Sequence, residues 1–521
     1  MNFSTNNWFR RLCVCGAALF FLASCQRRAV DPQVSATTLR MVTSFKINNL
    51  SPTDPRSFLL PEFGVAELPL RLDAAGQLQP WLLESYAQID ARNWRLTLRP
   101  KVIFQNGKPL AATAIAAAMN RQLATSASTK ATLPGAKVVT TGEREVTLTT
   151  AQPDATVPNA LADELVFPIY DVECVEAAGN DASKLIGSGC FTGPYNVISL
   201  DEREMRMVRF AGHWRGQPPL TEVSLRFVND PQARILAVQN DEADIALYPP
   251  SEAQRMLAGR NDAFFKVSAQ SFGGPRLLLN VRRAPFDELA VRRAFSLSLN
   301  YQSLATDVLD GISDVATGFY PPVWSWAVQN QKTDVNEARR LLDAAGWVAN
   351  GTEARVKNNV PLEVTLLVYP QQPDFAPLAT AMQAQLGEVG LHVQIRQVED
   401  INAAMRDGSV WHAAFHSPGL VTTGGAPDPF LREPLTSKGE RNFGGVNDAE
   451  LDRLVKELSL TFDPPHRAAL LARLQQIVIA ERVYEVRPVF MRSRVVVGRR
   501  WQNYQPSPQL HHITYETRSD Q

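Results

Sequence analysis

The sequence contains little cysteine and no excess of charge of either sign. Only five of its 521 residues are cysteine, which excludes a small scaffold held together by disulfides. The 53 basic and 53 acidic side chains cancel, whereas nucleic-acid-binding proteins usually carry a basic surface. A chain of this length is expected to form about three folded domains. The composition therefore predicts a multidomain globular protein that does not bind nucleic acid.

Long apolar runs are also missing, apart from one near the N-terminus. Arg10 and Arg11 precede an apolar stretch over 12–22, which is shorter than the roughly 20 residues of a membrane-spanning helix. This order is typical of a secretory signal, so residues 1–24 are expected to direct export. The stretch ends in Leu22-Ala23-Ser24-Cys25, which resembles the lipobox of bacterial lipoproteins.

The lipobox resemblance implies that Cys25 carries lipid after cleavage. The mature protein is then expected to be anchored to a bacterial membrane without a spanning helix, facing the periplasm or the cell exterior. Ordinary cleavage near Ala23 or Ser24, with Cys25 unmodified, is the alternative.

Two cysteines remain in the body of the chain. Cys174 and Cys190 are separated by 16 positions, and an exported protein is exposed to an oxidising environment. We expect a disulfide between them, with two buried thiols as the alternative. A zinc site would require more ligands than this pair supplies nearby.

Motifs of catalysis are missing as well. The sequence contains no G-x-S-x-G, no P-loop and no H-E-x-x-H, which are the signatures of common hydrolases, nucleotide-binding enzymes and zinc proteases. We therefore predict that the protein is not an enzyme and needs no resident cofactor.

Local patterns predict an α/β unit in the second half of the chain. Asp334 and Glu337 form a capping pattern before an apolar-periodic run to 345, and Gly346 ends it. A β-rich run over 362–369 is followed by a helix that Asp374 is expected to cap and that runs to about 389, and then by a strand over 391–398. Strand, helix and strand in this order predict a parallel pair with a right-handed crossover. Further helices are expected over 112–123, 231–240, 289–299, 448–460 and 466–482.

Several motifs follow one another in a recognisable order. Pro285-Phe286-Asp287 and Val291-Arg292-Arg293 fit the pattern P-F-x-D-x-x-V-R, and Pro427-Asp428-Pro429-Phe430 is close to D-P-x-x-F. Similar matches occur over 70–86, 94–110, 193–195, 233–245, 318–322 and 442–452. Together they resemble the extracytoplasmic solute-binding proteins of the peptide and nickel import family. Asn106 and Asp241 depart from the pattern, where an acid and a glycine are usual.

The resemblance implies an α/β fold of the two-lobed periplasmic-binding-protein type II, with a ligand cleft between the lobes and an extra domain in the first lobe. By position, the first lobe is expected over 25–68, 190–283 and 489–521. The extra domain is expected over 69–189 and the second lobe over 284–488.

The implied function is the substrate-binding component of an ABC transporter. Small peptides are the first expected cargo, and nickel or a nickel chelate bound by a metallophore is the alternative. The implied partners are an ABC permease and its ATPase, and the binding protein itself is expected to be a monomer. A ligand-sensing or chaperone lipoprotein without a transport role is the interpretation from another class.

One carboxylate is the leading candidate for ligand contact. In peptide-binding relatives, an acid at the position of Asp428 pairs with the ammonium group of the peptide, although Asp428 also fits a turn between two prolines. Further candidates for ligand contact are aromatic and polar residues that can reach the cleft: Phe45, Asn48, Tyr320, Trp324, Trp326 and Arg432. Arg432 and Arg441 flank the Asp428 region, and either can hold a carboxylate of the ligand.

The histidines keep the nickel alternative open. His412 and His416 lie in a strand-like run, where a spacing of four residues separates the rings by roughly 13 Å, so they cannot share one ion. His416 remains a candidate for both ligand contact and metal contact, because it begins the loop that leads to Asp428. His511 and His512 are the other candidate metal ligands, and imidazole suits nickel.

Overall fold

The computed structural model describes residues 37–520 except 180, 352 and 417–423. The signal segment and Cys25 lie outside the described residues, so both remain predictions. Among the described residues, no helix is both long enough and apolar enough to cross a membrane.

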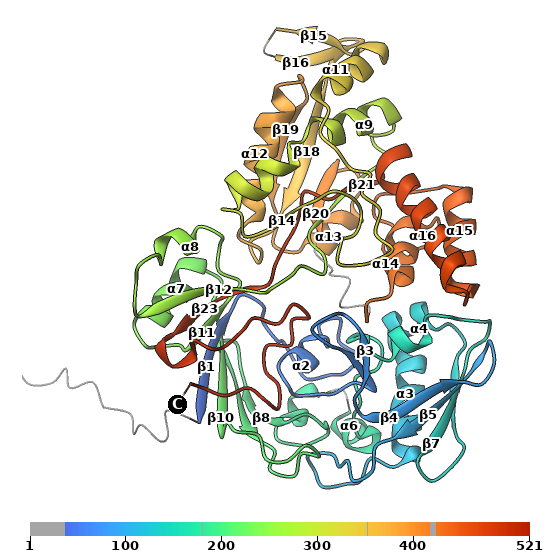
Figure 1. Cartoon of the computed structure of the whole chain (residues 1–521), viewed down its shortest axis with the longest axis vertical. Coiled ribbons are helices and arrows are strands. Elements are labelled where there is room, and N and C mark those ends of the chain that lie inside the picture. Colours follow the sequence, from blue (N-terminus) through green and yellow to red (C-terminus); the bar gives the residue numbers. More distant parts are fainter. Residues whose placement is uncertain (1–36, 180, 352, 417–423, 521) are drawn as a thin grey trace, which may run out of the picture.

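Three sheets organise the chain (Figure 1). We call the part built on the seven-stranded sheet the first lobe, the part built on the four-stranded sheet the extra domain, and the part built on the five-stranded sheet the second lobe. The second lobe stands above the other two in Figure 1.

The first-lobe sheet gathers strands from distant parts of the chain. Its order is β12 (Ala263–Val267), β23 (Arg494–Gly498), β11 (Ile245–Leu247), β1 (Thr38–Thr43), β10 (Glu222–Phe227), β9 (Glu204–Arg209) and β8 (Tyr195–Leu200). The first lobe also includes α2 (Leu59–Glu62), α7 (Pro231–Gln239) and α8 (Ala253–Met256). Met41, Leu225 and Val497 belong to one buried core of this lobe.

The extra domain packs helices on a small antiparallel sheet. The sheet order is β4 (Leu83–Gln88), β5 (Asn93–Leu98), β7 (Glu145–Thr149) and β6 (Lys137–Thr140). The neighbouring elements are β2 (Leu70–Leu72), β3 (Leu78–Pro80), α3 (Ala112–Thr125), α4 (Ala127–Thr132), α5 (Val157–Ala160) and α6 (Val172–Ala178). Trp94, Ile115 and Phe167 share a core that is separate from that of the first-lobe sheet.

The second lobe contains the predicted α/β unit. Its sheet runs β19 (His392–Gln397), β18 (Glu363–Val368), β20 (Ala413–His416), β13 (Arg276–Leu279) and β21 (Glu485–Val486). Strands β18 and β19 are parallel and joined by α12 (Phe375–Gly387), which confirms the strand, helix and strand prediction. The smaller pieces are α10 (Tyr301–Ser303), α13 (Ile401–Arg406), β14 (Asp314–Val315), β22 (Val489–Phe490), β15 (Val348–Asn350), β16 (Glu353–Lys357) and β17 (Val360–Pro361).

Five further helices belong to the second lobe. They are α9 (Leu289–Ser298), α11 (Val335–Ala344), α14 (Pro427–Leu435), α15 (Ala449–Leu460) and α16 (Pro464–Gln475), the last continued by a π-helical turn over Gln476–Glu481. The Asp334 side chain accepts a hydrogen bond from the Glu337 amide at 3.1 Å, as its capping pattern predicts. Asp374 precedes α12 but makes no side-chain cap, because its carboxylate binds residues of the first lobe instead.

Two segments connect the lobes, over 268–275 and 487–493, and the second of them includes β22. They run side by side, with the Ser268 amide donating to the Ser493 carbonyl at 2.8 Å. A Cβ on Gly274 would lie 2.3 Å from the Val489 carbonyl oxygen, so glycine permits this close approach. Strand β13 lies in the second-lobe sheet although it precedes residue 284, the predicted start of that lobe. The remaining division into lobes stays a prediction.

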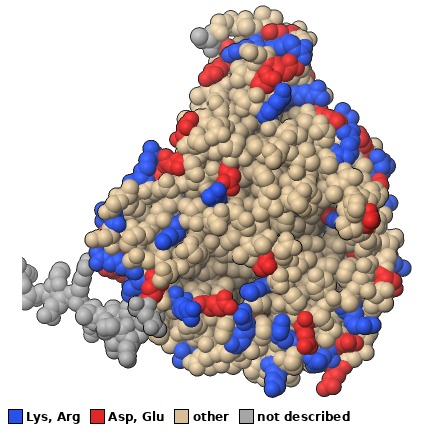
Figure 2. All heavy atoms as spheres, viewed as in Figure 1, with Lys and Arg blue, Asp and Glu red and all other residues tan. Residues whose placement is uncertain are grey.

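Surface charge agrees with the balanced composition. Figure 2 shows basic and acidic side chains interspersed over the face in view.

Candidate binding site between the lobes

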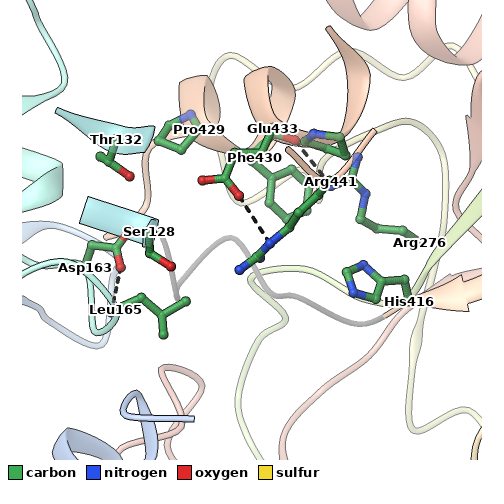
Figure 3. A pocket seen from close by; sticks show the side chains of 11 residues that line it. Ser128, Thr132, Asp163, Leu165, Arg276, His416, Pro429, Phe430, Glu433 and Arg441 are labelled. Carbon is green, nitrogen blue, oxygen red and sulfur yellow. Dashed lines mark hydrogen bonds and ion pairs between the residues drawn. The ribbon is translucent and has the colours of Figure 1, made fainter. Parts of the chain in front are cut away.

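A cavity lies where the second lobe meets the extra domain (Figure 3). The extra domain contributes Ser128, Thr132, Asp163 and Leu165, and the second lobe contributes Arg276, His416, Pro429, Phe430, Glu433, Pro434 and Arg441. The cavity volume is about 40 Å³, which accommodates roughly three water molecules.

Helix α14 supplies one side of the cavity. Pro427 occupies its first turn, where the missing amide hydrogen costs nothing. Pro429, Phe430 and Glu433 follow on the helix and reach the cavity. The α14 carboxylate of Glu433 forms an ion pair with Arg441 at 3.4 Å.

Arg276 reaches the cavity from strand β13 and is almost completely buried. Its Nε donates to Glu485 Oε2 at 2.9 Å, and its guanidinium carbon lies 4.3 Å from the centre of the Phe430 ring. A buried charge is stable only when it is paired and hydrogen bonded. Glu485 therefore stabilises the buried positive charge of Arg276 at the cavity wall.

His416, at the end of β20, lies in the same cavity. Its Nε2 contacts Asn402 Oδ1 at 3.2 Å, whereas its Nδ1 has no hydrogen-bond partner among the described residues. Burial lowers the pKa of His416 to about 3, with Arg276 and Arg441 acting in the same direction. The imidazole is therefore neutral at physiological pH and keeps a lone pair for a ligand.

Asp163 faces these groups from the extra domain. Its Oδ1 accepts a hydrogen bond from the Leu165 amide at 2.8 Å. Burial raises the pKa of Asp163 well above its usual range, and Glu433 raises it further while Arg441 opposes the shift. The cavity thus brings an acid of the extra domain together with an acid and two arginines of the second lobe.

Asp428 lies elsewhere. Its side chain has 0% exposure, and Oδ2 accepts a hydrogen bond from Arg467 Nη2 at 2.7 Å. Burial raises its pKa, an effect that Arg467 opposes. Asp428 is not among the described residues that line the cavity. Its Oδ1 has no hydrogen-bond partner among the described residues, and its pairing with a peptide ammonium stays a prediction.

The other predicted contact residues are also outside the cavity lining. Phe45 packs edge-on against Tyr248, with ring centres 4.9 Å apart, and Asn48 is exposed. Tyr320 is buried, and Arg432 donates to the Thr132 carbonyl at 3.2 Å. Trp324 and Trp326 stack on each other at 5.6 Å. Their ligand contacts remain predictions. Of the candidates named from the sequence, His416 and Arg441 are among the described residues that line the cavity.

The remaining histidines do not assemble a metal site with His416. His511 Nε2 lies 3.0 Å from Glu164 Oε1. His512 is buried, with its Nε2 3.1 Å from the Tyr248 hydroxyl. In the described part of the chain, no three His, Cys, Asp or Glu side chains are grouped so that they could hold a metal ion.

Sequence reasoning missed Arg276, Asp163 and Glu433. Arg276 begins the apolar run Arg-Leu-Leu-Leu, and an arginine in a buried strand is unusual enough to have served as a signal. Asp163 and Glu433 carry no comparable pattern. The predicted Cys174–Cys190 disulfide is present, with Cα atoms 5.5 Å apart.

Comparison with known proteins identifies the family. The family described as bacterial extracellular solute-binding proteins, family 5 Middle, matches residues 77–442. The chain belongs to this family. It is a solute-binding protein rather than an enzyme, and serves ABC transport of peptides or nickel outside the cytoplasm.

Individual relatives are distant but cover almost the whole chain. The nickel-binding periplasmic protein of Escherichia coli is 26% identical over 95% of both chains. The structure of NikA from Staphylococcus aureus with Ni(L-His)2 superposes with a TM-score of 0.80 at 20% identity, covering 93% of this chain and 100% of that one. The oligopeptide-binding protein AppA from Bacillus subtilis, with a nonapeptide, has a TM-score of 0.77 at 18% identity, with coverage of 92% and 98%. These structures confirm the predicted two-lobed fold.

Proposed function

We propose that this protein captures a small nickel chelate and delivers it to an ABC permease. The observation that carries the proposal is His416, a neutral imidazole with an unpartnered ring nitrogen in a cavity that also contains two arginines. Neutral imidazole is a good ligand for nickel. Nickel-binding relatives support the same cargo.

One imidazole is not enough for a bare ion. The described residues form no cluster of three metal-ligating side chains, so most of the coordination must come from the cargo itself. A chelator with carboxylates supplies that coordination, and Arg276 and Arg441 can each bind a carboxylate through charge-assisted hydrogen bonds. Together, these features favour a chelate over the free ion.

A short peptide is the second candidate. Asp163 and Glu433 lie in the same cavity as Arg276 and Arg441, so a zwitterion could place its ammonium and carboxylate groups on opposite charges. The family includes peptide-binding proteins such as AppA. The location of Asp428 beside Arg467 weakens the ammonium anchor expected from sequence.

Uptake requires motion of the lobes. Because the cavity holds only a few waters, the cargo is expected to enter an open state and to favour the closed state by touching both walls. Lipid on Cys25 would keep the protein at the membrane beside the permease and ATPase, as the lipobox suggests.

Calorimetric titration with nickel complexes tests the cargo. The mature chain with Cys25 replaced is titrated with nickel chloride, with nickel bound to L-histidine, and with a set of dipeptides. Nickel complexes should bind to the wild type. His416→Gln should lower the affinity for them by roughly tenfold or more, because the variant lacks one metal ligand.

A second histidine in the same lobe provides the control. His392 lies at the start of β19 and does not line the cavity, so His392→Gln should bind as the wild type does. Binding of dipeptides without any nickel complex would replace the chelate with a peptide. Equal nickel affinity of His416→Gln and wild type would remove His416 from the site.

A further inference from the structure

A buried group of three charges lies behind the cavity wall. Arg276, Glu485 and Arg487 each have at most 2% exposure. Glu485 Oε2 accepts from Arg276, and Glu485 Oε1 lies 3.0 Å from Arg487 Nη2. Two guanidinium groups therefore share a single carboxylate.

The surroundings do not cancel the second positive charge. Arg487 donates to the Gly274 carbonyl at 3.3 Å, and its Nε has no hydrogen-bond partner among the described residues. The Phe319 ring lies 4.4 Å from its guanidinium carbon. A carbonyl group and an aromatic face lower the free-energy cost of burying a cation, but neither carries a negative charge that compensates it.

The excess positive charge of this group reaches the cavity through Arg276. Arg487 occupies one oxygen of Glu485, so Glu485 cannot neutralise Arg276 completely. Arg441 adds a positive charge at the same cavity, and Glu433 offsets it. On the second-lobe side, the cavity lining and the charges directly behind it therefore comprise three cations and two anions: Arg276, Arg441 and Arg487 against Glu433 and Glu485. Asp163 faces them from the extra domain, and burial raises its pKa, which favours its neutral form.

We infer that the cargo carries net negative charge, with its carboxylates received by Arg276 and Arg441, and that Arg487 keeps Arg276 available by sharing Glu485. The identity of the cargo as a chelate rests on the proposed function, whereas its charge follows from this wall. A neutral solute would leave the excess cation uncompensated when the lobes close over it. An anion removes that cost, so charge selects among solutes of similar size.

The test compares solutes that differ in charge. The mature chain with Cys25 replaced is titrated with the negative nickel–EDTA complex and with the neutral bis-histidine complex of nickel. A metal-free pair, Gly-Glu and Gly-Gln, gives the same contrast in peptides. Wild type should bind the more negative member of a pair at least tenfold more tightly, about 1.4 kcal/mol, and the ratio should fall as salt is raised.

Three variants locate the selectivity. Arg276→Gln and Arg441→Gln should each reduce the affinity ratio by roughly tenfold, because each loses a charge-assisted contact with the anion. Arg355, a buried arginine of the same lobe that binds Asp343, is remote from the cavity lining, so Arg355→Gln should leave the ratio unchanged. If Arg276→Gln does not fold, the Arg441→Gln ratio still decides.

The outcomes separate the inference from the proposed function. Binding of both nickel complexes with equal affinity overturns the charge inference and leaves nickel as cargo. Binding of Gly-Glu in preference to Gly-Gln, with no nickel complex bound, overturns nickel and supports the charge inference. A ratio that is unchanged in both Arg276→Gln and Arg441→Gln overturns the assignment to these arginines.

Discussion

The contact that joins the lobes at Asp374 is expected to be essential for stability. Asp374 belongs to the second lobe and is 2% exposed. Its Oδ1 accepts from the Ser251 amide at 2.9 Å, and its Oδ2 accepts from the Ser251 hydroxyl at 2.6 Å and from Arg494 Nη2. Ser251 and Arg494 belong to the first lobe, so one carboxylate binds both lobes together.

Asp374→Asn keeps the shape of the side chain but removes its charge. Arg494 then remains buried without a carboxylate, since its other hydrogen bond goes to the Pro249 carbonyl at 2.8 Å. Breaking a buried ion pair on one side costs about 3–5 kcal/mol. We expect the free energy of unfolding to fall by that amount and the lobes to separate more readily.

Urea unfolding followed by tryptophan fluorescence measures the first effect, and the radius of gyration from X-ray scattering measures the second. Asp400→Asn is the control, because Asp400 caps α13 through the Ala403 amide at 3.0 Å on the surface and asparagine caps helices about as well. A loss below about 1 kcal/mol in Asp374→Asn, equal to that of the control, would refute the buried-pair argument.

Three further predictions concern the disulfide, a buried acid and the lipid anchor. Replacing Cys174 and Cys190 with serine should lower the free energy of unfolding by about 3 kcal/mol, and reduced wild type should match the variant in urea titrations; unchanged stability would contradict the bond. Because burial raises the pKa of Asp163, its protonated form is favoured in the folded state, so stability should be full below about pH 4 and decline as pH rises. Asp163→Asn should remove this decline in thermal melts across pH, and an identical pH profile would argue against it. Cys25→Ser should abolish incorporation of labelled fatty acid in cells, whereas continued labelling would place the lipid elsewhere.

The sequence determined most local structure of the second lobe. Alternating and helical hydrophobic patterns placed β18, α12 and β19 in their observed order, because burial of one face imposes a period on the chain. The cap at Asp334 could also be predicted from the sequence, since Asp334 and Glu337 are only three residues apart. Asp374 misled for the same reason, because a local cap pattern carries no information about Ser251 in another lobe.

The family resemblance predicted the two-lobed fold but little of the candidate site. Its motifs identified Asp428, and the structure pairs that residue with Arg467 from another helix. His416 was anticipated from its place before a loop. Arg276 was not, although its position in an apolar strand was visible in the sequence.

The sequence alone contains the pattern of an export signal, a balanced number of charges and the pattern of an α/β unit, and it contains none of the common catalytic motifs. These properties can be read from the sequence because they depend on composition and on neighbouring residues. Only the tertiary structure brought Asp163 of the extra domain to the cavity that Arg276, His416 and Arg441 line. The same holds for the sharing of Glu485 by Arg276 and Arg487. Arg276 and Glu485 are 209 positions apart in the chain, and the energy of a buried charge depends on which groups the fold places around it.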